Sequence, residues 1–171
     1  MKKFLSAVIV FCVMIFSANC QAKVIRVADI GAENFYNNME DVFRSKNYDI
    51  ELSSLNFDEP GIWSCYFGKI NFSNPTGKVI FKIDSYGYVS EVTIVSALDF
   101  ELLNFVITAV FYTIDINEAE YNELLRQVND NTQSAKIPSV WSNSKNRNFN
   151  VMCIPLQNMV EYIFSADDGR N

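Results

Sequence analysis

The chain has 171 residues, 49% of them hydrophobic, and carries 14 basic against 20 acidic side chains. This negative balance argues against nucleic acid and anionic membrane surfaces as partners, because both repel an excess of carboxylates. The sequence contains no histidine, which excludes the usual serine triad and most zinc, copper and haem sites. We therefore expect neither a metal ion nor a cofactor.

The N-terminus has the layout of a secretory signal peptide. A short basic head precedes an apolar run over residues 4–16, and small and polar residues follow. We expect an exported protein, periplasmic or secreted, in which residues 1–22 are removed and residues 23–171 form one domain. Two alternatives stay open: an uncleaved N-terminal segment that anchors the chain in the membrane, and a lipid on Cys20.

Two cysteines, Cys65 and Cys153, stay in the chain once such a signal peptide is removed. Exported proteins commonly oxidise such pairs. The sequence therefore favours one disulfide between them over two buried free thiols. A catalytic cysteine is not expected, because the chain has no histidine to act as its base.

The first predicted elements are a short strand and a helix. Residues 23–30 contain several β-forming side chains and predict a strand that ends at Gly31. Residues 32–46 carry apolar side chains at helical spacing and predict an amphipathic helix. Residues 48–74 look irregular and rich in aromatic side chains, with residues 63–68 as either a short strand or a loop.

The clearest pattern is a hairpin followed by a very apolar helix. Residues 79–95 alternate as two antiparallel strands around a turn at residues 84–87, where aspartate comes first and glycine last. Ser96, with Asp99 three residues later, predicts the cap of the helix. The run over residues 105–114 is assigned to this helix, although its period also permits a buried strand.

The last third of the chain predicts three further elements. Asn117 and Glu120 are typical of a cap for a helix over residues 118–128. A strand is expected over residues 149–154 and a terminal helix over residues 156–164. The predicted fold class is therefore α+β, with a small antiparallel sheet, formed by the hairpin and the late strand, packed against two to four helices.

No catalytic motif accompanies these elements. The only acid–base candidates are carboxylates without a diagnostic spacing, so we expect no enzyme activity and keep a small carboxylate-dependent envelope enzyme as a third hypothesis. The aromatic side chains form either part of the core or a patch that binds a partner. The candidates for partner contact are Trp63, Tyr66, Tyr86, Tyr88 and Trp141.

One stretch, residues 77–113, resembles the C-terminal domain that TonB and TolA proteins share. The matching positions are Val79, Ile80, Phe81, Lys82, Ile83, Asp84, Gly87, Val89, Val92, Val95, Ser96, Leu98 and Asp99. The strand over residues 149–154 resembles that family's closing strand, which would pair with the hairpin. The resemblance implies binding of a protein or peptide at an exposed strand edge. It does not imply energy transduction, because the sequence shows no long linker.

The leading hypothesis is an exported, non-enzymatic α+β module that binds a protein or peptide partner in the cell envelope. The alternative is a periplasmic immunity or inhibitor protein that neutralises a toxin. Small size, export, acidity and a single disulfide suit that role, and none of these features is specific to it.

Overall fold

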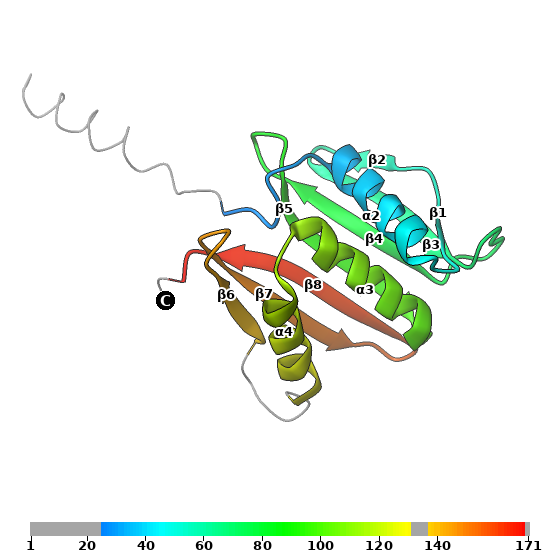
Figure 1. Cartoon of the computed structure of the whole chain (residues 1–171). Helices are drawn as coiled ribbons and strands as arrows, with labels where there is room; N and C mark the ends of the chain where they lie inside the picture. The colour runs from blue at the N-terminus through cyan, green and yellow to red at the C-terminus, as the bar shows by residue number, and fades with distance from the viewer. Residues whose placement is uncertain (1–24, 131–136, 170–171) are drawn as a thin grey trace, which may run out of the picture.

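The computed structural model describes residues 25–130 and 137–169, so the predicted signal peptide lies outside the described residues (Figure 1). Within them, three helices lie on one face of a single antiparallel sheet of eight strands. This arrangement confirms the predicted α+β class, with a larger sheet than the sequence indicated. No helix in these two ranges is both long enough and apolar enough to cross a membrane.

The predicted hairpin forms the centre of the sheet. In chain order the strands are β1 (Glu51–Leu52), β2 (Asn56–Glu59), β3 (Ile62–Gly68), β4 (Gly77–Ile83), β5 (Val89–Ala97), β6 (Ser139–Ser142), β7 (Arg147–Pro155) and β8 (Met159–Asp167). Their order in the sheet is β1-β3-β4-β5-β8-β7-β6, and β2 also pairs with β3. The hairpin β4–β5 is therefore flanked by β3 on one side and by β8 on the other.

The helices are α2 (Ala32–Lys46), α3 (Phe100–Ile114) and α4 (Glu118–Asp130). The predicted bounds of α2 are confirmed, and the apolar run over residues 105–114 is helical. Asp99 caps α3 by accepting a hydrogen bond from the N–H of Leu102 at 3.3 Å, whereas Ser96 is buried within β5. The cap of α3 is therefore Asp99 and not Ser96, because β5 continues to Ala97.

The predicted cap of α4 is confirmed. The N–H of Glu120 donates to Asn117 Oδ1 at 2.9 Å, and the N–H of Asn117 donates to Glu120 Oε2 at 3.1 Å. Such a reciprocal pair satisfies two backbone donors that the first turn of a helix leaves without a partner. The local sequence is sufficient for this start, since both partners lie within four residues.

Three predicted elements are wrong. The described part of the first predicted strand, residues 25–30, is irregular, although the N–H of Ala28 donates to the backbone oxygen of Val89 at 3.1 Å. Residues 48–74 contain β1 and β2 where irregular chain was expected, whereas β3 confirms the strand alternative for residues 63–68. Residues 156–164 mostly belong to β8 and not to a helix. The strand forms because β8 pairs with β5 on one side and β7 on the other, and because its alternate residues Val160, Tyr162 and Phe164 then point toward the helices.

The implied partner of the late strand is also different. The predicted strand over residues 149–154 lies within β7, but β7 pairs with β6 and β8. The strand that pairs with the hairpin is β8, through β5. The resemblance therefore placed the wrong C-terminal strand beside the hairpin.

The predicted disulfide is not compatible with this sheet. Cys65 is buried on β3, Cys153 is exposed on β7, and both thiols are free. They stand at the two ends of a row of directly paired residues that crosses five strands, Cys65–Val79–Ile94–Tyr162–Cys153. Four strand spacings of about 4.8 Å put roughly 19 Å between them. A disulfide needs Cα atoms within about 7 Å, so this order of strands does not bring the two cysteines within reach of each other. Sequence spacing carried no information on the order of strands.

The core lies between the sheet and the helices. Its largest fully buried side chains are Phe35, Phe67, Phe81, Phe164, Met39, Ile94, Leu124, Val27, Val79, Val89, Val92 and Val106. The rings of Phe35 on α2 and Phe81 on β4 lie 5.4 Å apart, which shows how α2 seats on the hairpin. Burying each such side chain contributes about 1.5–3 kcal/mol.

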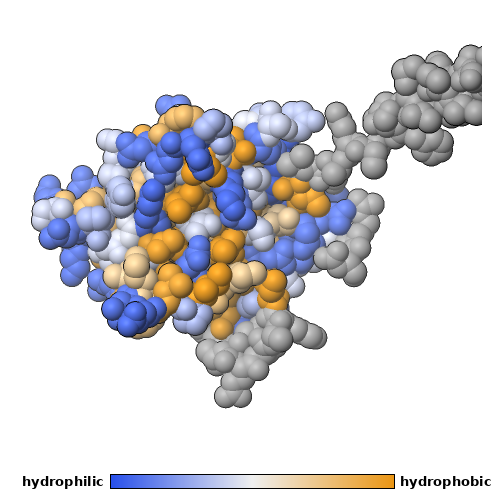
Figure 2. Space-filling model, turned by 180° about the vertical axis from the view of Figure 1, so that it is seen from behind, coloured by the Kyte–Doolittle hydropathy of each residue, from blue (hydrophilic) through white to orange (hydrophobic). Residues whose placement is uncertain are grey.

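The helices cover one face of the sheet only. Along β4, Val79 and Phe81 are fully buried against the helices, whereas Lys78, Ile80 and Lys82 point to the other side. We call this other side the open face. It consists of alternate residues of the strands, and Figure 2 views it directly, with hydrophobic residues gathered across its middle.

Candidate functional site

A groove of about 840 Å³ lies on the open face over β6, β7 and β8. Its floor has a row of Trp141, Asn148 and Asp167, a second row of Ser139, Asn150 and Ser165, and an apolar end of Met152, Ile163 and Ile137. The floor therefore changes from aromatic and polar to apolar along the strands. A concave surface with apolar lining and a few convergent polar groups is typical of a binding site.

Asp167 organises the polar end of the groove. Its Oδ2 accepts hydrogen bonds from Asn150 Nδ2 at 2.7 Å and Asn148 Nδ2 at 3.2 Å, and its Oδ1 accepts one from the N–H of Gly169 at 2.7 Å. Burial raises the pKa of Asp167, but these hydrogen bonds outweigh burial and hold the pKa below its usual value. Asp167 is therefore ionised at neutral pH and keeps both amides in place.

Trp141 is held from two sides. Its Nε1–H donates to Asn143 Oδ1 at 3.1 Å. Its ring lies against the backbone of Gly169, where a Cβ would come within 3.0 Å of the indole Cζ3 atom. The side chain is nevertheless 41% exposed. An exposed aromatic side chain that is already fixed loses little conformational entropy when a partner covers it.

Apolar side chains continue across the open face beyond the groove. Met152 is 38% exposed, and Ile154, Ile163, Val95 and Ile80 are half-buried. They lie on β7, β8, β5 and β4, which are adjacent strands. A contiguous apolar surface of this kind marks an interaction site more often than isolated exposed residues do.

Two carboxylates on the open face form no ion pair with any cation of the described residues. Lys78 Nζ binds Asp58 Oδ2 at 2.9 Å, and Lys82 Nζ binds Glu91 Oε1 at 2.6 Å, so both lysines of β4 are neutralised. The side chain of Glu161 on β8 makes no hydrogen bond or ion pair within the described part of the chain, and the carboxylate of Asp167 makes no ion pair there.

The structure does not bring the five predicted aromatic residues together. Tyr66 and Trp141 reach the open face, but they stand on β3 and β6, toward opposite sides of the sheet. Trp63 pairs with Phe81 and so points to the helix-covered side. Of the predicted set, Trp141 alone lines the groove.

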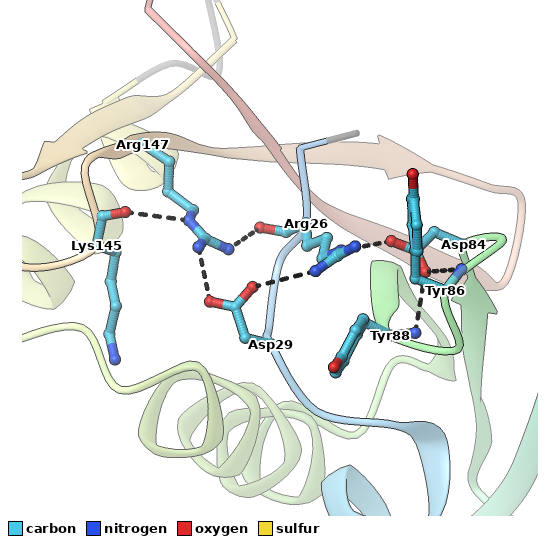
Figure 3. Close-up of polar contacts among 7 residues, drawn as sticks. All are labelled: Arg26, Asp29, Asp84, Tyr86, Tyr88, Lys145 and Arg147. Atoms are coloured by element: carbon cyan, nitrogen blue, oxygen red, sulfur yellow. Dashed lines mark hydrogen bonds and ion pairs between the residues drawn. The ribbon is translucent and has the colours of Figure 1, made fainter. Parts of the chain in front are cut away.

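Tyr86 and Tyr88 belong instead to a clasp of polar contacts at one end of the sheet (Figure 3). Arg26 Nε donates to Asp84 Oδ2 at 2.5 Å, and its guanidinium carbon lies 4.3 Å from the ring centroid of Tyr88 and 5.1 Å from that of Tyr86. Burial raises the pKa of Asp84, but bonds from the Tyr88 and Tyr86 backbone and from Arg26 outweigh it and lower the pKa. The clasp thus fixes the hairpin turn.

Arg147 extends the clasp to β7 (Figure 3). It donates to the backbone oxygen of Arg26 at 2.5 Å, to Asp29 Oδ2 at 2.8 Å and to the backbone oxygen of Lys145 at 3.3 Å. Arg147 immediately precedes Asn148, whose amide lines the groove. The clasp therefore fastens the described N-terminal segment to the strand that forms the groove floor.

The hairpin has no free edge. β4 pairs with β3 and β5, and β5 pairs with β4 and β8. Binding at an exposed hairpin edge, which the resemblance implies, is therefore not available in this sheet. The outer strands are β6 on one side and β1 and β2 on the other.

Most groove residues were not predicted from the sequence. Asn148, Asn150 and Met152 alternate with buried Phe149 and Val151, and this period of two was a usable signal. Asp167 was not predicted, because no element was expected beyond residue 164.

The two carboxylates of β8 are too far apart to act together as a glycosidase pair. Glu161 and Asp167 lie six residues apart on β8, hence roughly 20 Å. Glycosidases hold their two carboxyl groups about 5–9.5 Å apart. Among residues 25–130 and 137–169, no three cysteine, aspartate or glutamate side chains form a group that could hold a metal ion.

No family model matches the chain, and no curated protein or solved structure matches it either. Its function has to be inferred from the geometry and chemistry of the open face.

Proposed function

We propose that this chain is an exported, non-enzymatic module that binds a protein partner in the cell envelope through its open face. The groove over β6–β8, with the apolar surface beside it, carries the proposal. An antiparallel sheet that faces water normally alternates apolar and polar side chains. Ile163, Ile154 and Met152 break this rule on the solvent side, which supports a surface that a partner covers.

The open face has the dimensions of a protein interface. Six adjacent strands, from β3 to β6, span roughly 24 Å across the sheet, and the nine-residue strands β7 and β8 are roughly 30 Å long. The product is roughly 700 Å², close to the about 800 Å² per partner of a standard interface. The fixed indole of Trp141 suits an anchor residue near one end of that area.

Export and the lack of enzyme activity enter the proposal from the sequence. The basic head and the apolar run over residues 4–16 support secretion. The separation of Glu161 and Asp167 supports binding instead of catalysis. A family relationship to TonB and TolA domains is not needed for this proposal, since the hairpin edge takes no part in it.

The experiment couples partner capture to disruption of the open face. Residues 23–171 are tagged and incubated with an extract of the cell envelope, and retained proteins are identified by mass spectrometry. Met152→Arg places a cation in the groove, and Leu98→Arg makes the same change at an exposed apolar residue outside it. Wild type and Leu98→Arg should retain one stoichiometric partner that Met152→Arg loses. Equal retention by all three proteins contradicts the proposal.

A further inference from the structure

We propose that the open face recognises a basic partner, which brings one cationic side chain to Glu161 and another to Asp167 on either side of an apolar contact with Ile163. This inference rests on the proposed function and adds the chemistry of the partner. It concerns the row that β8 presents to solvent, Glu161, Ile163, Ser165 and Asp167.

Glu161 is surrounded by apolar side chains. Its cross-strand neighbours are Ile154 on β7 and Val95 on β5, both apolar, and Ile163 follows on the same face of β8. Glu161 is half-buried among them, and no cation of the described chain pairs with it. A carboxylate thus stands in the middle of the apolar surface that a partner would cover.

Covering this carboxylate without a counter-charge is unfavourable. Removing an ion from water costs more than the surrounding apolar contact returns unless an opposite charge and hydrogen bonds replace the water. The same holds for Asp167, whose remaining charge has no ion-pair partner in the described chain although its oxygens accept hydrogen bonds. A partner that covers both carboxylates therefore has to supply both cations.

No cation of residues 25–130 and 137–169 pairs with either carboxylate. Lys78 and Lys82 point to the same face, but each already binds a carboxylate at 2.9 Å or less. A second copy of this chain would present the same uncompensated acids and the same neutralised lysines. Like charges across an interface are unfavourable, so self-association through the open face is disfavoured, and an anionic lipid surface is disfavoured for the same reason.

The spacing defines the partner further. Glu161 and Asp167 are six residues apart on one strand, which corresponds to roughly 20 Å. An extended segment that runs along β8 would match this with two basic residues six positions apart and small apolar residues at the alternate positions between them. This pattern also suits the alternative that the partner is a basic toxin.

The test uses two synthetic peptides, the basic KSVSVSK and the acidic ESVSVSE, each added to the 15N-labelled protein. The basic peptide should shift the amide signals of Met152, Ile163 and Ser165 with a Kd on the order of 1 mM. Higher salt should weaken it, because the ion pairs are screened. The acidic peptide should leave these signals unchanged. Equal shifts with both peptides, or none with either, overturn the inference.

Charge-neutral variants locate the effect. Glu161→Gln should weaken the basic peptide about three-fold, and so should Asp167→Asn. Glu33→Gln removes the same charge from exposed α2 and should change nothing. Sedimentation of the free protein should show a monomer; a dimer that Met152→Arg dissociates would overturn the inference in favour of a second copy.

The same variants separate this inference from the proposed function. Both proposals are supported if Met152→Arg fails to retain the captured partner and the double variant Glu161→Gln/Asp167→Asn binds it at least three-fold more weakly than wild type does. If Met152→Arg loses the partner and the double variant binds it unchanged, the open face is the docking surface and the basic partner is wrong. If none of the variants weakens capture, both proposals fall.

Discussion

The indole of Trp141 packs against the backbone of Gly169, so closely that a Cβ at this position would lie 3.0 Å from the ring. Gly169 adopts a φ of 66° and donates its N–H to Asp167 Oδ1. The aromatic residue and the carboxylate of the groove are therefore coupled through one glycine.

Gly169→Ala should displace Trp141 while leaving the sheet folded. The added Cβ meets the ring, and alanine is strained at positive φ by about 1 kcal/mol. In a Trp63→Phe background, tryptophan emission should shift to longer wavelength as the indole becomes more exposed. Gly87→Ala is the control, because it has the same strain but nothing within 4 Å of its Cβ. An unchanged emission spectrum in Gly169→Ala would contradict the contact.

Asp167→Asn should lower the free energy of unfolding by about 1 kcal/mol at pH 7, because three hydrogen bonds to a charged oxygen pair are weakened. The pKa of Asp167 is lower in the folded state than in the unfolded one. Its contribution is therefore complete above about pH 4, the unfolded value, and is lost as the pH falls through the folded value. Urea unfolding of both proteins between pH 2 and 7, in steps of about one unit, should show the difference shrink toward acid. A constant difference would exclude ionisation as its origin.

Arg26→Ala should destabilise the protein by about 2 kcal/mol, since the side chain of Asp84 is only 3% exposed and would lose its cation. Urea denaturation followed by circular dichroism measures this loss. Arg44→Ala is the matched control, because its ion pairs with Glu40 and Asp41 involve a side chain that is 73% exposed. That change should cost less than about 0.5 kcal/mol. Similar values for the two variants would show that the clasp does not hold the N-terminal segment.

The two cysteines should differ in reactivity. Cys153 is exposed and should react with a thiol reagent in the native protein, whereas burial raises the pKa of Cys65 to about 12 and shields it. Cys65 should react only after unfolding in denaturant. Intact mass before and after labelling counts the modified thiols. A chain with no reactive thiol and a mass lower by two hydrogens would mean that the sheet order described above is wrong.

The hairpin turn and the cap of α4 were predictable because their partners are close in the chain. Asp84 Oδ1 accepts the N–H groups of Tyr86 and Tyr88, and Gly87 takes the left-handed conformation, as the turn residues indicated. The reciprocal bonds of Asn117 and Glu120 are equally local. The alternation that made the hairpin recognisable is a property of the strands themselves.

That residues 159–167 form a strand could be recognised only from the strands beside them, β5 and β7. Residues 156–164 are compatible with helical spacing and with alternation, and a short run does not distinguish the two. Pairing with β5 and β7 decides for the strand, because it buries Val160 and Phe164 under the helices. This same pairing turns Glu161, Ile163 and Asp167 to solvent, so the groove became visible only with the sheet order.

By itself, the sequence determined the α+β class, the central hairpin, the three helices and their starts to within a few residues, since these depend on contacts within a few positions. The tertiary structure alone decided that Cys65 and Cys153 lie roughly 19 Å apart, that the hairpin has no free edge, and that the described helices all cover the same face of the sheet. The physical reason is that sheet order and layer packing depend on pairings between distant segments, whose register local patterns do not encode.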